Sequence, residues 1–313
     1  LVTGAVGFVG SSLCSSLIGW KAVRAAVRDP AKSNFSGAVD VVRYQLSSSF
    51  DWAGLLSGVD QVVHCAARVH VTKEEAADPL AEFRSVNVDG TLVLARQAAE
   101  AGVRRFIFIS SIGVNGGETT AHPFTVDDSV SPHTPYAVSK HEAEVGLRAL
   151  AEDTAMEIVI IRPPLVYGPN APGNFYSLMK FLASRVPLPL GSVKANRRSF
   201  VYLDNLIDLI VTCLDHPKAA NQTFLVSDGE SLSTAALLRR MGDALGRPAR
   251  LIPVPVPLLQ TGAALAICAV VLLLGLAGDS LAVNASALSL RGLAAGVLPD
   301  VQHFWLCDAL AHG

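Results

Sequence analysis

Three glycines at the start of the chain restrict the possible folds more than any other feature. In "TGAVGFVG", Gly4, Gly7 and Gly10 separate a strand-like run from a helix-like pattern over residues 8–18. The first glycine of such a loop permits a tight turn, the second lets the backbone approach a pyrophosphate, and the third lets the helix pack close to the strand. The helix N-terminus then offers free N–H groups to phosphate oxygens. The loop therefore predicts a bound dinucleotide.

Strand-like and helix-like runs alternate over the first half of the chain. The strand-like runs are nearly all apolar, which is typical of strands that are covered on both faces. They are "LVTGA", "AVRAAVR", "DVVRYQL", "VDQVVHCAA", "RRFIFISS" and "MEIVIIRPP". Helix patterns lie between them, including residues 86–101, which Gly102 ends, and residues 135–153. This alternation predicts an α/β fold with a doubly wound parallel sheet of the Rossmann type.

The chain changes character after its sixth strand-like run, where Pro and Gly become frequent and the pattern becomes irregular. We expect a dinucleotide-binding Rossmann domain over residues 1–165, to which residues 199–226 return. A smaller C-terminal lobe is expected from residues 166–198 and 227–260. Ligands of such folds bind at the carboxyl ends of the strands, so we expect this lobe to bind the substrate there.

The end of the second strand bears on the choice between NAD and NADP. An acidic residue at this place would hydrogen-bond a ribose 2′-hydroxyl, whereas an arginine accommodates a 2′-phosphate. Arg28 takes the tip of the strand and Asp29 follows it. Both cofactors stay open, and Arg28 favours NADP.

The segment "PYAVSK" places a tyrosine and a lysine four residues apart on the long helix pattern. That separation puts Tyr136 and Lys140 on one face of the helix. A free tyrosine has a pKa of about 10, which is too high for efficient proton transfer near neutrality, and a nearby ammonium favours the phenolate. The pair suits hydride transfer between a nicotinamide and a secondary alcohol or ketone, with Tyr136 as the base and Lys140 lowering its pKa.

These motifs and others between them resemble the extended short-chain dehydrogenase/reductase family, and within it the NAD-dependent epimerase/dehydratase group. The matching segments are collinear over about residues 1–250: "TGAVGFVG", "HCAA", "NVDGT", "FIFISSIGVNG", "PYAVSK", "RPPLVYGP" and "SFVYLDNLID". The resemblance implies a Rossmann fold, a nicotinamide cofactor and a homodimer. The two protomers would pair through the helices over residues 86–101 and 136–151.

The resemblance also assigns roles to single residues. It places Ser111 at the family's catalytic serine or threonine, with Ser110 as the second candidate, and gives Lys140 a further contact to the nicotinamide ribose. Asn87 matches a helix asparagine whose role in the family is mainly structural. His64 lies in a buried strand, and we interpret it as a hydrogen-bonded core histidine. The residues expected at the cofactor are Gly4, Gly7, Phe8, Val9, Gly10, Arg28, Gln45, Leu46, Ala66, Ala67, Lys140 and Pro163.

The two positions after Ser111 narrow the reaction. The family's nucleotide-sugar 4,6-dehydratases carry an Asp–Glu pair there, whereas this chain has Ile112 and Gly113, which cannot transfer a proton. Dehydration by that mechanism is therefore not expected. Two reactions at the 4-position of a UDP-sugar remain. An epimerase returns the hydride to the other face of the ketone, and a 4-keto-reductase releases oxidised cofactor. Arg28 favours NADP as the cofactor, and NADP favours the reductase slightly, because epimerases of the family recycle a tightly bound NAD.

By the same resemblance, Asn174 and Arg198 would bind the diphosphate of a nucleotide sugar, and Arg197 is the alternative to its neighbour. Ser111 and Tyr136 would contact the sugar. A guanidinium and an amide are suitable donors to phosphate oxygens.

The chain departs from the family pattern in two places. Leu165 stands where many nucleotide-sugar members have an asparagine, and Gln45 and Leu46 stand where an aspartate usually contacts the adenine. The segment "VRAAVRDP" is similar to NADP-dependent members that reduce dihydroflavonol or steroid ketones. A non-sugar ketone is therefore the alternative substrate, against which Arg198 argues.

Composition excludes several other functions. The net charge is −2 and no long basic run occurs, so a nucleic-acid partner is not expected. The five cysteines show neither C-x-x-C nor another metal-ligand spacing. We therefore expect reduced thiols, no metal and a cytoplasmic location.

The C-terminal tail, residues 261–313, is atypical. Residues 251–278 contain no Asp, Glu, Lys or Arg, whereas relatives of the family usually carry a charged helical segment here. Three interpretations stay open. The tail is a divergent or frame-shifted sequence, a membrane-associated helix over residues 258–276, or a packed helix.

Overall fold

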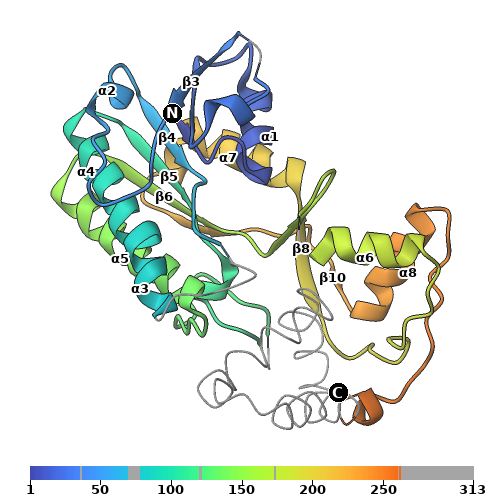
Figure 1. The fold of residues 1–313 in the computed structure, drawn as a ribbon. Coiled ribbons are helices and arrows are strands. Elements are labelled where there is room, and N and C mark those ends of the chain that lie inside the picture. The colour runs from blue at the N-terminus through green and yellow to red at the C-terminus, as the bar shows by residue number, and fades with distance from the viewer. Residues whose placement is uncertain (36, 70–77, 120–121, 173, 260, 262–313) are drawn as a thin grey trace, which may run out of the picture. The chain divides into compact units, whose positions relative to one another are not determined.

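The computed structural model describes residues 1–35, 37–69, 78–119, 122–172, 174–259 and 261 (Figure 1). These residues form two compact units, and the chain passes between the units three times. The first unit comprises residues 1–169 and 200–228, and the second comprises residues 170–199 together with the described residues from 229 onward. The predicted tail lies outside the described residues, apart from Thr261.

The first unit contains a sheet of seven parallel strands in the order β3-β2-β1-β4-β5-β6-β9. The strand order reverses between β1 and β4, which is the switch point of a doubly wound sheet. The predicted α/β Rossmann sheet is thus confirmed. The strands are β1 (Val2–Thr3), β2 (Val23–Val27), β3 (Val39–Arg43), β4 (Gln61–His64), β5 (Arg105–Ile109), β6 (Glu157–Arg162) and β9 (Thr223–Leu225).

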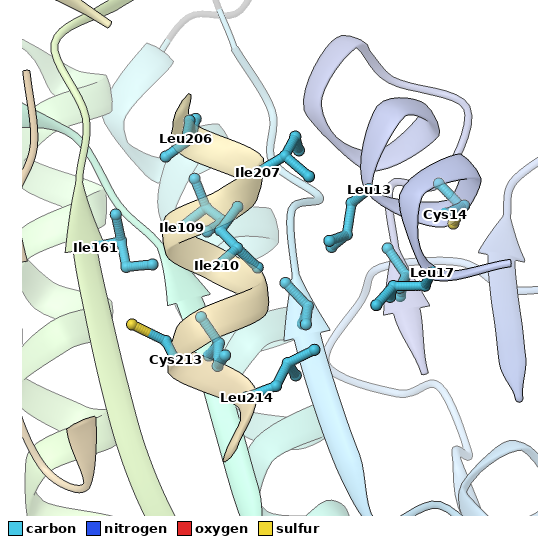
Figure 2. Packing of buried hydrophobic residues seen from close by; sticks show 14 of the residues in the cluster. Leu13, Cys14, Leu17, Ile109, Ile161, Leu206, Ile207, Ile210, Cys213 and Leu214 are labelled. Carbon is cyan, nitrogen blue, oxygen red and sulfur yellow. The ribbon is translucent and has the colours of Figure 1, made fainter. Parts of the chain in front are cut away.

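Helices α1 (Phe8–Leu17) and α7 (Leu203–Asp215) pack against one face of this sheet. Figure 2 shows Leu206, Ile207 and Ile210 on α7, with Leu13 and Leu17 of α1 on one side of the helix and Ile161 of β6 on the other. The apolar residues of α7 recur every three or four positions, so they fall on one side of the helix. The chain returns to the first unit at residue 200, and α7 then completes this layer of helices.

The opposite face is covered by α2 (Ala53–Leu56), α4 (Thr91–Glu100) and α5 (Pro135–Asp153). Their buried residues form a second core with the strand side chains that point to this face of the sheet. The principal members of that core are Trp52, Leu56, Leu94, Ala98, Phe106, Phe108, Leu147 and Ile160. Because both faces are covered, β5 is buried along its whole length, which accounts for the apolar run that follows its first residue, Arg105.

The helix expected over residues 86–101 begins differently from the prediction. After α3 (Pro79–Arg84), the segment Ser85–Gly90 is a π-helix, and α4 continues from Thr91 to Glu100. A π-turn contains one residue more than an α-turn, and such turns are frequent at functional sites. Gly102 follows the end of α4 with a φ of 80°, as a helix-terminating glycine should.

The second unit contains α6 (Asn174–Ala183) and α8 (Thr234–Ala244), which contact each other. Ser233 caps α8 by accepting a hydrogen bond from the Ala236 N–H. Strand β10 (Ser231–Leu232) pairs antiparallel with the first residues of β8 (Arg198–Tyr202). In the first unit, β8 continues as a parallel partner of β7 (Leu165–Tyr167).

Within the described part of the chain, no helix has the length and apolar character that crossing a membrane requires. Most of the predicted apolar helix over residues 258–276 lies outside the described residues.

Candidate functional site

The glycine loop connects β1 to α1 and brings its backbone close to the end of β4. Gly4 has a φ of 67°, and a Cβ atom there would lie 2.8 Å from the Ala66 nitrogen. The Gly7 N–H donates to the Gly4 carbonyl at 2.9 Å. A Cβ on Gly10 would fall on that same carbonyl. A side chain at the first or third position would therefore displace backbone, which explains the spacing of the glycines.

The N-terminus of α1 has the features of a phosphate site. Gly7 is its N-cap, no described side chain caps the helix, and its first turn contains no acidic residue. Among the described residues, the first N–H groups of the helix therefore have no capping side chain, and its own first turn brings no carboxylate to the positive end of its dipole. Phe8 and Val9, expected at the cofactor, are half-buried in this first turn. The loop thus fits the pyrophosphate of a dinucleotide.

The ends of β2 and β3 lie beside the loop. Arg28 is exposed at the tip of β2. The Asp29 carboxylate accepts a hydrogen bond from the Ala31 N–H at 3.2 Å and so caps a short 3₁₀ helix. After β3, Gln45 is exposed and Leu46 packs against Gly90, where a Cβ would lie 2.9 Å from the leucine Cγ. The Asp29 carboxylate is therefore hydrogen-bonded within its own turn, and the Arg28 side chain faces solvent.

Helix α5 presents Tyr136 and Lys140 on one face. Its start is fixed by Thr134, whose side chain accepts a hydrogen bond from the Ala137 N–H, and by Pro135 in the first turn. Lys140 is buried, and its ammonium donates to the Ile109 carbonyl at 2.8 Å. The ammonium nitrogen lies 4.3 Å from the Phe108 ring centroid and 6.0 Å from that of Tyr136.

Burial dominates the pKa values of this pair. It raises the pKa of Tyr136 to about 12 and lowers the pKa of Lys140 to about 8, because both charged forms lose hydration. For Tyr136 the cause of the rise is burial, which acts in the opposite direction to the lowering expected from a nearby ammonium.

The two adjacent serines after β5 have different partners. Ser111 is half-buried and caps the short helix Ile112–Val114, accepting a hydrogen bond from the Gly113 N–H at 3.1 Å. Ser110 is buried, and its hydroxyl donates to the Glu144 carboxylate at 2.6 Å. The hydroxyl of Ser110 is therefore committed to the interior, as the alternation of side chains along a strand suggests.

A buried ion pair lies beneath these residues and was not predicted from the sequence. The Arg162 guanidinium donates to both oxygens of Glu144, at 2.6 and 2.9 Å, and to the Asn115 side-chain oxygen at 2.9 Å. Glu144 and Arg162 are fully or almost fully buried. The sequence does carry a signal for it, because Glu144 continues the four-residue spacing of Tyr136 and Lys140 along α5.

Two further residues of the first unit join this region to its surroundings. Asn87, on the π-helix, binds the Arg68 backbone with both ends of its amide and donates to the Ser139 hydroxyl at 3.0 Å. That hydroxyl donates in turn to the Tyr136 carbonyl at 2.7 Å. The ring of Phe83, which the sequence analysis did not single out, contacts the Tyr136 ring edge to face at 6.2 Å between centroids.

His64 is a fully buried residue at the end of β4. Its two ring nitrogens are hydrogen-bonded to the hydroxyls of Thr3 and Thr91, at 2.7 and 3.0 Å. Burial lowers its pKa to about 3, so the ring is neutral near neutrality. It has the hydrogen bonds expected of a core histidine.

The remaining strand-end positions lie at the carboxyl edge of the sheet. Ala66 is buried and Ala67 half-buried after β4. The carbonyl of the buried Pro163, which follows β6, accepts a hydrogen bond from the Ile112 N–H at 3.0 Å. This bond joins the segments that follow β5 and β6, directly after Ser111.

The residues expected at the substrate diphosphate lie in the second unit. Asn174 begins α6, the half-buried Arg198 begins β8, and Arg197 precedes it with an exposed side chain. Ser111 and Tyr136 belong to the first unit. Among the described residues, no group of three His, Cys, Asp or Glu side chains is arranged to hold a metal ion.

Comparison with known proteins gives consistent results. Residues 1–227 match the sequence profile of the NAD dependent epimerase/dehydratase family. The chain is 48% identical to a UDP-glucose 4-epimerase of Vibrio cholerae over 259 residues, which cover 82% of this chain and 78% of that relative. It is 30% identical to a UDP-glucose 4-epimerase of Mycolicibacterium smegmatis, covering 79% of this chain and 83% of that relative.

Among solved structures, the fold is similar to that of a UDP-glucuronic acid 4-epimerase from Bacillus cereus in complex with UDP-glucuronic acid and NAD. The TM-score is 0.70 at 26% identity, and the match covers 80% of this chain and 86% of that one.

Proposed function

The chain belongs to the NAD dependent epimerase/dehydratase family, and from that premise we propose that it is a 4-epimerase of a UDP-sugar that works with bound NAD. One observation carries the proposal. Tyr136 and the buried Lys140 lie one helical turn apart, and the ammonium reaches the end of β5 at the carboxyl edge that also bears the glycine loop. The relatives named above, which are UDP-sugar 4-epimerases, support the substrate class.

In the proposed reaction Tyr136 is the proton carrier. It accepts the proton of the sugar 4-hydroxyl as the carbon is oxidised. It returns a proton to the oxygen after the keto-sugar has rotated to present its other face. When bound, the nicotinamide takes the hydride from that carbon and gives it back. Ser111 donates a hydrogen bond to the reacting oxygen. Lys140 favours the phenolate electrostatically, which opposes the rise in the tyrosine pKa that burial causes.

The proposal selects among the alternatives of the sequence analysis. Epimerisation regenerates the cofactor in every cycle, so no second substrate is required for its reoxidation. Ile112 and Gly113 offer no acid or base for dehydration. NAD is proposed as the cofactor because the similar epimerase structure contains it. The exposed Arg28 keeps NADP as the competing cofactor in the same assays.

We assign substrate binding to the second unit, with Arg198 and Asn174 at the diphosphate. A guanidinium at the start of β8 suits bidentate binding of phosphate oxygens. A homodimer paired through α4 and α5 is part of the same proposal. Light scattering of the purified protein tests the dimer, and a monomer at assay concentration contradicts it.

The proposed function is tested by incubating the protein with NAD or NADP and a panel of UDP-sugars, with their 4-keto forms in parallel. Proton NMR identifies the sugar product, and absorbance follows the reduced nicotinamide. We expect one sugar to reach equilibrium with its 4-epimer without net change in cofactor. Net oxidation of NADPH by a 4-keto-sugar would identify a reductase instead. Turnover of dihydroflavonol or steroid ketones alone would refute the sugar substrate.

A further inference from the structure

Three ionisable side chains recur every four residues along α5. Tyr136, Lys140 and Glu144 are separated by one helical turn each, and the last two are 2% and 0% exposed. Side chains at this spacing are neighbours on a helix surface. The proposed mechanism uses the tyrosine and the lysine and gives the buried carboxylate no role. Its burial requires an explanation, because an ionised carboxylate is costly to remove from water.

The partners of Glu144 come from the strand ends that flank the proposed site. The hydroxyl of Ser110, just after β5, donates to one oxygen at 2.6 Å. The guanidinium of Arg162, the last residue of β6, donates to both oxygens at 2.6 and 2.9 Å. The exposed Arg148 makes a longer contact at 3.3 Å. The carboxylate thus ties α5 to the two strand ends that continue into Ser111 and Pro163.

Among the described residues, the groups around Lys140 include the Glu144 carboxylate, which is itself paired with the Arg162 guanidinium. The lysine ammonium contacts the Ile109 carbonyl and the Phe108 ring. In the part of the chain that the structure describes, four ionisable groups lie around it: Tyr136 and Glu144 on its own helix, and His64 and Cys65 at the end of β4. Burial raises the pKa values of the tyrosine and the cysteine to about 12 and lowers that of the histidine to about 3, so all three are neutral near neutrality.

We propose that Glu144 is a positioning residue for the proposed reaction, which keeps the Lys140 ammonium charged and holds the strand end that carries Ser111. The carboxylate opposes the loss of charge that burial imposes on the lysine, whose pKa stands at about 8. A charged lysine then favours the Tyr136 phenolate. The catalytic consequence rests on the proposed function, whereas the effect on the lysine charge does not.

The test compares two substitutions on one helix. Glu144→Gln preserves the size of the side chain and removes its charge. Glu142→Gln removes a carboxylate two residues away, where it is paired with Arg84 at the surface, and is the matched control. Two quantities are measured in the full chain: the pH dependence of kcat, and the titration midpoint of the Lys140 ammonium by NMR of protein labelled with ¹⁵N-lysine. A Lys140→Arg sample assigns the resonance.

We expect Glu144→Gln to lower the Lys140 midpoint, and with it the alkaline limb of the kcat profile, by about one pH unit, the usual effect of a nearby opposite charge. Glu142→Gln leaves both unchanged. Glu144→Asp, which restores the charge, returns the midpoint towards the wild-type value. A wild-type midpoint in Glu144→Gln overturns the proposal. A wild-type protein that epimerises no UDP-sugar refutes the proposed function, and the NMR titration then still decides whether Glu144 sets the lysine charge.

Ser110→Ala tests the second half of the proposal and serves also where Glu144→Gln does not fold. It removes only the hydrogen bond between the carboxylate and the end of β5 and leaves the ion pair with Arg162. We expect kcat to fall several-fold while KM and the Lys140 midpoint stay unchanged. Wild-type kcat in this variant overturns the positioning role.

Discussion

Substitutions of two glycines separate the cost of a left-handed backbone from the cost of a steric clash. Gly4→Ala introduces a side chain at a φ of 67°, with its Cβ 2.8 Å from the Ala66 nitrogen and 2.9 Å from the Ala66 Cα. Gly58→Ala introduces the same side chain at a φ of 71°, with no heavy atom within 4 Å of the new Cβ. Both variants carry the backbone strain, and only Gly4→Ala carries the clash.

The magnitudes follow from these two terms. A left-handed backbone costs an alanine about 1–2 kcal/mol, which is the full loss expected for Gly58→Ala. Overpacking adds about 1–3 kcal/mol where the neighbours cannot yield, and here the neighbours are backbone atoms of the strand-β4 end. Gly4→Ala is therefore expected to lose about 2–5 kcal/mol of the free energy of unfolding.

The assay is equilibrium unfolding in urea for stability, together with calorimetric titration of NAD. Relief of the clash moves the loop away from Ala66, so Gly4→Ala is expected to bind NAD at least ~10-fold more weakly, a loss of about 1.4 kcal/mol. Gly58→Ala binds it as the wild type does. Equal stability losses in the two variants would refute the argument from close backbone approach, and unchanged NAD affinity in Gly4→Ala would refute the assignment of the loop to the cofactor.

Three further predictions concern the region around α5 and β4. Tyr136→Phe lowers kcat by about 10²–10⁴-fold while calorimetry shows unchanged NAD affinity; wild-type turnover would exclude the tyrosine as proton carrier. Arg162→Ala leaves the Glu144 carboxylate buried without its main partner and costs about 3–5 kcal/mol in urea unfolding, whereas loss of the exposed Arg84 changes stability far less. His64 has a pKa of about 3 in the folded protein and about 6.5 when unfolded, so its contribution to stability is present above pH 6.5 and is lost as the pH falls towards 3. Denaturation curves of His64→Gln between these pH values are expected to show a weaker pH dependence, and an identical dependence contradicts the assignment.

Local patterns predicted most of the first unit. The apolar runs predicted β1 to β6 because the inner strands are buried on both faces, and the glycine spacing placed the loop where the backbone closes on Ala66. The family resemblance is confirmed by the match over residues 1–227. The π-turn at Ser85–Gly90 was not predicted, since its buried positions are Asn87 and Gly90, which form no apolar pattern.

The partners of Glu144 were beyond reach of the sequence for a different reason. Ser110 and Arg162 lie 34 and 18 residues from it, and only the packing of α5 on the sheet brings them together. The lysine contact was missed likewise. Tyr136 and Lys140 share a helix face as predicted, and the ammonium donates to the Ile109 carbonyl, which lies 31 residues away along the chain.

The discontinuity of the first unit has a consequence for the order in which the chain acquires structure during synthesis. Helix α7, which covers one face of the sheet beside α1, is encoded after the whole first segment of the second unit. A nascent chain that has emerged as far as residue 199 therefore exposes the apolar surface that Leu206, Ile207 and Ile210 later cover. Emerging chains with such uncovered surface are the species that chaperones bind and that aggregate. Ribosome pausing or premature termination between residues 170 and 203 should therefore be more harmful to the yield of folded protein than the same event after residue 228.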